Sequence, residues 1–217
     1  MRRLLAGAGI TLLLAASLTT ESAAKQKAAQ GAVLTQNDLR ICMGVDGSTY
    51  DEQIAVCTKV IKSGKVKPPY HGDYYATRGA AYFGKGDLNN ALADLDTAIG
   101  IRKAAEFYFQ RALIQMSRKS FDDAKADLAE VTKQKPDFAP AFFMRGLIAY
   151  TSADYSEALS NFDGAVKRRP TYFQAIYARG VTKTKLGDES GGKSDMTAAT
   201  GMSPKVAKEM ENLGLSL

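Results

Sequence analysis

The stretch "RGAAYFGKGDLNNALADLD", Arg78 to Asp96, contains the pattern that decides the fold. Gly79 lies in its first half, and Ala91 follows twelve residues later in its second half. The same pair of small residues returns after intervals of 33, 34 and 34 residues, at Ala112 and Ala124, Gly146 and Ala158, and Gly180 and Gly192. A fixed period of this length predicts a repeated unit of two helices joined by a turn.

The glycines indicate how the two helices of a unit pack. A glycine inside a helix costs about 1 kcal/mol relative to alanine. Because Gly79, Gly146 and Gly180 hold the same place in three units, we expect the two helix backbones to approach closely there. A side chain at this place would keep the helices apart.

The pattern resembles the tetratricopeptide repeat family. A large residue of the first helix stands four residues before the small one, and another stands four residues after the second-helix alanine. The first set is Tyr75, Tyr108, Phe142 and Ile176, and the second is Leu95, Leu128, Phe162 and Met196. The resemblance implies an all-α, right-handed solenoid with four repeats, at residues 72–104, 105–138, 139–172 and 173–203.

Further elements are expected at both ends of the four repeats. Residues 36–71 read as a degenerate helical hairpin, and residues 204–217 as a capping helix and tail. Helix starts are expected where a capping residue precedes an acid by three positions, as in Thr49–Glu52, Ser120–Asp123 and Asp154–Glu157. Gly191 and Gly192 in the fourth repeat predict a frayed or distorted second helix.

The first 24 residues read as a secretory signal peptide. Arg2 and Arg3 precede the apolar run Leu4–Leu18, and the small residues Ser22–Ala24 follow. Cleavage after Ala24 would leave residues 25–35 as a flexible linker and place the protein in the periplasm or outside the cell. A membrane anchor is the alternative. We expect no stable membrane insertion once the leader is removed, since no later stretch is long and apolar enough.

Cys42 and Cys57 are the two cysteines of the chain. In an oxidising compartment such a pair predicts a disulfide, here between the two helices of the first hairpin. His71 is the single histidine, so neither a metal site nor a catalytic triad can be assembled around it. No strand pattern is evident in the sequence, and so no glycine-rich phosphate-binding loop follows a strand. We therefore expect no enzyme activity, no metal and no cofactor.

An arginine precedes an aspartate by 16 residues in three repeats, at Arg78 and Asp94, Arg111 and Asp127, and Arg179 and Asp195. The third repeat has Arg145 and Asn161 instead. In a helix–turn–helix unit this spacing places both residues on facing helices, which predicts an ion pair within each hairpin. The alternative is a row of arginines that binds an anionic ligand, and it requires arginines without partners.

The resemblance assigns a partner-binding groove to the concave face, which the first helices line. The predicted groove residues are Phe83, Phe109, Leu113, Met116, Phe143, Leu147, Tyr150, Tyr177 and Val181. This apolar stripe could hold a protein or peptide partner, the chain's own Gln30–Leu34 segment, or a second copy in a homodimer. In a tightly wound superhelix the same residues would be core. The face lacks the lysines and asparagines with which some relatives grip an acidic C-terminus.

Charge defines the competing function. Without Arg2, Arg3 and Glu21 the 29 basic and 23 acidic residues become 27 and 22, which is a formal net charge of +5. This mild excess contains no dense basic block and does not favour nucleic-acid binding. We therefore expect a protein-binding scaffold, with a role in envelope assembly or secretion. The alternative is a binder of an anionic glycan or lipid.

Overall fold

The structure is a computed structural model that describes residues 34–45, 47–65 and 70–216. These residues form eleven α-helices and no strand. The helices are α2 (Gln36–Cys42), α3 (Tyr50–Lys62), α4 (His71–Gly84), α5 (Leu88–Ile101), α6 (Ala105–Ser117), α7 (Phe121–Gln134), α8 (Ala139–Thr151), α9 (Tyr155–Arg168), α10 (Phe173–Lys185), α11 (Glu189–Met202) and α12 (Val206–Asn212). The predicted leader, residues 1–24, lies outside the described residues.

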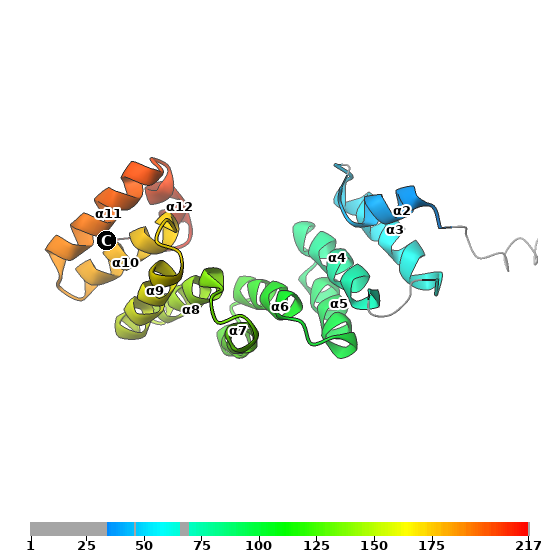
Figure 1. Ribbon diagram of the computed structural model, residues 1–217, viewed down its shortest axis with the longest axis horizontal. Coiled ribbons are helices and arrows are strands. Elements are labelled where there is room, and N and C mark those ends of the chain that lie inside the picture. Colours follow the sequence, from blue (N-terminus) through cyan, green and yellow to red (C-terminus); the bar gives the residue numbers. More distant parts are fainter. Residues whose placement is uncertain (1–33, 46, 66–69, 217) are drawn as a thin grey trace, which may run out of the picture.

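Five helical hairpins follow one another in an arch (Figure 1), and α12 closes the far end. The hairpins are α2–α3, α4–α5, α6–α7, α8–α9 and α10–α11, and each packs against its neighbour in the chain. The expected all-α solenoid is therefore confirmed. None of the described helices is both long and apolar enough to cross a membrane.

The repeated glycines lie where the two helices of a hairpin meet. A β-carbon added at Gly79 would stand 3.1 Å from the carbonyl oxygen of Ala91. One added at Gly146 would stand 2.5 Å from the ring of Phe162. The close approach predicted from the repeated small residues is confirmed in both units, and it explains why glycine is retained inside these helices.

The fourth repeat corrects one expectation. Helix α11 is a regular helix of 14 residues, and Asp188 caps it by accepting a hydrogen bond from the Gly191 N–H at 2.9 Å. A β-carbon at Gly192 would stand 2.2 Å from Thr184 Oγ1 and 2.7 Å from the carbonyl oxygen of Gly180. The expected distortion was wrong, because Gly192 lets α11 pack closely against α10.

The predicted helix caps differ in outcome. Thr49 and Glu52 form the full reciprocal capping box at the start of α3. Asp154 accepts from the Glu157 N–H at 2.9 Å, which satisfies one of the orphan donors of α9. Ser120 precedes α7 but makes no side-chain cap, so that expectation was wrong. A further box, formed by Thr35 and Asp38 at the start of α2, was not predicted.

One residue in the turn of each repeat has a left-handed backbone. The first and fourth repeats use glycine, Gly86 with φ 80° and Gly187 with φ 92°. The second and third use Lys119 with φ 61° and Ala153 with φ 59°. L-residues with a β-carbon rarely adopt this conformation because the β-carbon approaches the following carbonyl oxygen. The middle two turns are therefore strained relative to the outer two.

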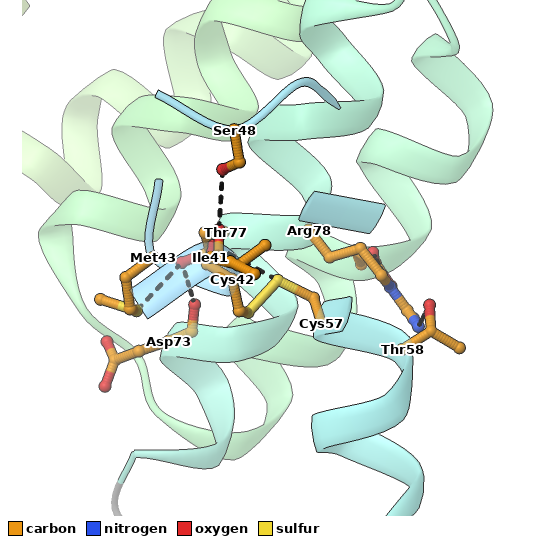
Figure 2. The surroundings of a disulfide bond; sticks show 10 residues. Ile41, Cys42, Met43, Ser48, Cys57, Thr58, Asp73, Thr77 and Arg78 are labelled. Carbon is orange, nitrogen blue, oxygen red and sulfur yellow. Dashed lines mark hydrogen bonds and ion pairs between the residues drawn. A yellow bond between two sulfur atoms is a disulfide. The ribbon is translucent and has the colours of Figure 1, made fainter. Parts of the chain in front are cut away.

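The two ends of the solenoid are secured differently. The predicted disulfide between Cys42 and Cys57 is present, with the two Cα atoms 4.8 Å apart, and it joins α2 to α3. Figure 2 shows it beside Arg78 of α4, which donates to Thr58 Oγ1 on α3 at 2.9 Å. At the other end α12 packs against α10 and α11. Met210 and Val206 of α12 are fully buried there.

The buried apolar side chains of the repeats form two clusters. One extends from α4 to α8, and the other from α8 to α12. Met116 of α6 and Met144 of α8 pack against both clusters. Flexible methionine side chains therefore link the two clusters, while Ala141 and Ile148 of α8 are buried in the first one.

Candidate interaction surface

The predicted groove residues fall into two groups in the structure. Phe83, Phe109, Leu113, Met116 and Tyr177 are half-buried, whereas Phe143, Leu147, Tyr150 and Val181 are buried. The buried members come from α8 and α10. One continuous exposed stripe along all four first helices is therefore not what the fold forms.

Four of the nine predicted residues line one open pocket of about 420 Å³. They are Phe83, Leu113, Met116 and Leu147, which come from α4, α6 and α8. The other walls were not predicted from the sequence, and they are Ser117, Lys119, Phe121, Met144, Thr151 and Leu213. We call this cavity the first-helix pocket. Its apolar walls suit a hydrophobic side chain.

Two of the predicted aromatic residues lie away from this pocket. Phe143 is 3% exposed and packs on Phe162 and Tyr172, with ring centroids 5.8 and 5.2 Å apart. Phe109 meets Phe138 edge to face at 5.1 Å and lines a separate cavity of about 230 Å³. Phe143 is therefore a core residue, because the third and fourth repeats close around it.

The segment that follows α12 covers part of the surface predicted for a partner. Leu215 is 2% exposed and belongs to the second apolar cluster. The hydroxyl of Tyr150 donates to the carbonyl oxygen of Ser216 at 3.0 Å. Burial is the main cause that raises the pKa of Tyr150 above its usual value. The Gln30–Leu34 segment, proposed from sequence as an occupant, lies outside the described residues except for Leu34.

The predicted arginine–aspartate pairs are confirmed. Nε and Nη2 of each arginine donate to the two carboxylate oxygens of its aspartate, at 2.7–2.8 Å, in Arg78–Asp94, Arg111–Asp127 and Arg179–Asp195. Hydrogen bonding to the aspartate is the main cause that raises the pKa of each arginine. These three guanidinium groups are therefore already engaged by carboxylates.

Each of these arginines also reaches the preceding hairpin, which the sequence argument missed. Nη1 of Arg111 donates to Asp96 at 2.6 Å, and Nη1 of Arg179 donates to Asp163 at 3.1 Å. Asp96 and Asp163 occupy the same place in their repeats, two residues after Asp94 and Asn161 respectively. This second spacing was visible in the sequence and could have predicted the contacts between repeats.

The described part of the chain offers no candidate metal centre. No group of three or more His, Cys, Asp or Glu side chains lies close enough there to hold an ion. The acids of the repeats are used in ion pairs and helix caps.

Comparison with known proteins gives one family match, over a single repeat, and several structures of similar fold. The sequence model of the tetratricopeptide repeat matches residues 72–104. A search of curated protein sequences found no match. A crystal structure of MamA superposes with a TM-score of 0.67 at 18% identity, covering 81% of this chain and 99% of the other. MamA from Desulfovibrio magneticus RS-1, residues 41 to the end, gives 0.68 at 14% identity, with 78% and 95% covered.

A third similar structure is YrrB, whose description is "a TPR protein with an unusual peptide-binding site". It superposes with a TM-score of 0.59 at 16% identity, and 75% of this chain and 84% of YrrB are covered. At such identities the likeness shows the fold, while the matched repeat supplies the sequence link. The chain therefore matches the tetratricopeptide repeat by sequence at residues 72–104, and its stacked hairpins have the same fold as YrrB, which is described as a TPR protein.

Proposed function

We propose that the protein is an exported, non-enzymatic scaffold that binds a segment of another protein in the first-helix pocket. The observation that carries the proposal is the pocket itself. Phe83, Leu113 and Met116 stay half-buried in the folded chain and converge on one open apolar cavity. Half-buried large apolar side chains around a cavity are typical of ligand and partner sites.

The fold supports a peptide-sized ligand. YrrB, which has the same fold, is described as having a peptide-binding site. In the present chain the residues after α12 already lie against Tyr150, with Leu215 buried and the Ser216 carbonyl hydrogen-bonded. A segment with an apolar side chain thus already packs on this side of the fold. A partner segment of similar chemistry would place one apolar side chain in the pocket.

Selection of peptides from a random displayed library tests this function. Peptides selected on the wild-type protein should carry a recurrent apolar residue. Leu113→Glu should abolish their binding, because it places a charge in the apolar cavity. Ile101→Glu is the matched control, since Ile101 is 43% exposed and does not line the pocket. Peptides that bind wild type and Leu113→Glu equally would exclude the pocket, provided that both variants keep the wild-type helical circular dichroism.

Export is the second part of the proposal. The disulfide supports it, because such bonds persist in oxidising compartments. We expect the mature chain to begin near Lys25 and to be found in the periplasm or medium. Intact mass of the protein isolated from its native source, with and without reductant, measures both features. A chain that retains Arg2 and two free thiols would contradict export.

Binding of an anionic glycan or lipid is the alternative function. It loses support because Arg78, Arg111 and Arg179 are occupied by aspartates. Salt separates the two functions, since apolar peptide binding should persist at raised ionic strength while charge-driven binding should weaken.

A further inference from the structure

Arg145 differs from the other three arginines of its register. Arg111 and Arg179 each hold one carboxylate from their own repeat and one from the preceding repeat. At Arg145 both places have changed. The own-repeat place is Asn161, and the place in the preceding repeat is Ala129. Within the described residues Arg145 accordingly makes no ion pair, although it is half-buried.

The side chains around these two places do not replace the lost carboxylates. Asn161 is 7% exposed, and its amide Nδ2 donates to the carbonyl oxygen of Glu157 on its own helix at 2.9 Å. The Glu157 carboxylate lies 3.7 Å from Lys125 Nζ. Glu157 lies one helical turn before Asn161 on α9, and Lys125 lies one turn before Ala129 on α7. The nearby acid therefore already has a cation of its own.

A second arginine makes the same region more positive. The guanidinium of Arg168 lies 3.6 Å from the centroid of the Phe142 ring, one turn before Arg145 on α8. It donates to the carbonyl oxygens of Pro136 at 2.6 Å and Gly164 at 3.0 Å. Arg168 is thus held in place by neutral groups, and its charge is not cancelled by a carboxylate among the described residues.

We propose that Arg145 is a binding site for an acidic side chain of a partner protein that docks on the α7–α9 side of the solenoid. The ligand is a carboxylate because the same fork, in the same register, binds a carboxylate two-pronged at Arg111 and Arg179. The partner supplies the group that Asn161 and Ala129 do not. Arg145 lies on α8, which also carries Met144 and Leu147 of the first-helix pocket, but Arg145 is not among the walls of that pocket.

The ligand is part of a protein because one ion pair of this kind contributes little alone. Such a contact at a partly exposed site changes affinity by about two- to fivefold. A free carboxylic acid would then leave the site mostly empty at ordinary concentrations. An acidic residue within a larger protein contact avoids this limit, since the rest of the interface supplies the affinity.

The test uses a fluorescein-labelled hexaglutamate peptide as the probe and measures its binding to the full chain by anisotropy at low ionic strength. Arg145→Gln should weaken binding about two- to fivefold. Arg118→Gln, which removes an exposed arginine of equal charge, is the control for net charge. Equal losses in the two variants would overturn the proposal, because the probe would then sense only the overall charge.

Asn161→Asp provides a second and independent test. It restores the carboxylate present at Asp127 and Asp195, so Arg145 should be occupied from within the chain. Probe binding should fall as in Arg145→Gln, while the melting temperature rises. Asn212→Asp, on the exposed end of α12, is the matched charge control. A lower melting temperature for Asn161→Asp would show that Arg145 cannot reach this place and would also overturn the proposal.

Inorganic phosphate, titrated at constant ionic strength, distinguishes carboxylate from general anion binding. We expect acetate and phosphate to displace the probe only weakly and to similar extents. Displacement by phosphate at concentrations at which acetate has no effect would assign the site to phosphate-bearing ligands instead. Failure of all these measurements leaves the peptide selection at Leu113 unaffected, because the two sites share no residue.

Discussion

The carboxylate of Asp127 accepts two hydrogen bonds from Arg111, from Nε at 2.8 Å and from Nη2 at 2.7 Å, and so joins α6 to α7. The Asp127 side chain is 6% exposed and that of Arg111 is 22% exposed. Two-pronged geometry and low exposure distinguish this pair from the ordinary surface pair, which contributes little. Its removal should therefore have a measurable effect on stability.

A double-mutant cycle with Arg111→Ala and Asp127→Ala should show a coupling free energy of roughly 0.5–3 kcal/mol. The single change Arg111→Ala should be the more costly one, because it leaves the Asp127 carboxylate without an ion-pair partner among the described residues, whereas Asp127→Ala leaves Arg111 its pair with Asp96. Chemical denaturation of the four proteins measures the cycle. Additive single effects would mean that the two charges act independently.

Phe143→Ala should lower the free energy of unfolding by about 3–5 kcal/mol, because Phe143 is enclosed by Phe162 and Tyr172. Phe83→Ala, at the half-buried wall of the first-helix pocket, should cost only about 1–2 kcal/mol. Urea unfolding monitored by helical circular dichroism compares the two. Similar losses at both positions would contradict the division of the predicted groove into core and open surface.

The α2–α3 hairpin should lose stability in acid. A hydrogen bond from Lys59, followed by those from Thr35, lowers the pKa of Asp38 from 3.8 to about 2. Because the unfolded carboxyl group binds its proton more readily, the stabilisation is complete above about pH 4 and disappears as the pH falls towards 2. Asp38→Asn should flatten this part of the profile. The melting temperatures of wild type and Asp38→Asn, measured between about pH 5 and about pH 2.5, check this assignment. An equal fall of both melting temperatures over this range would disprove it.

Ala153→Gly should raise the free energy of unfolding by roughly 0.5–1 kcal/mol, since glycine adopts the left-handed conformation of Ala153 without strain. The glycines at the same place in the first and fourth repeats show that the turn accepts this residue. Ala126→Gly, at an exposed position inside α7, should instead cost about 1 kcal/mol. Thermal unfolding of both variants measures the direction in which each changes the free energy of unfolding. Destabilisation by Ala153→Gly would show that the turn is not strained.

Much of the fold could be predicted because the same pattern of small residues occurs in all four repeats. The spacing of Gly79, Ala91 and their counterparts led to the hairpins, and the 16-residue spacing of Arg111 and Asp127 led to the ion pairs. The prediction for Gly192 was wrong because helix propensity takes no account of the neighbouring helix. Only the structure shows that Gly192 faces Gly180, where the absence of a side chain allows close packing.

The candidate site was less predictable, because exposure depends on how neighbouring repeats close around a residue. Phe109 and Phe143 occupy the same place in neighbouring first helices, yet Phe143 is buried, whereas Phe109 is half-buried and lines an open cavity. The contact of Leu215 and Ser216 with the Tyr150 region joins residues 66 positions apart. No local pattern encodes such a contact.

The missing acids at Asn161 and Ala129 also bear on how the repeats unfold. In a linear array the stability of the whole depends on the coupling between adjacent repeats. Arg78, Arg111 and Arg179 fasten their hairpins to the preceding ones, whereas Arg145 does not. The junction between α7 and α8 is held instead by the packing of Ala141 and Ile148 in the first cluster and by the Lys125–Glu157 pair at 3.7 Å. The chain should therefore open as two cooperative blocks that separate between α7 and α8. Amide hydrogen exchange would show them as two groups of protection factors.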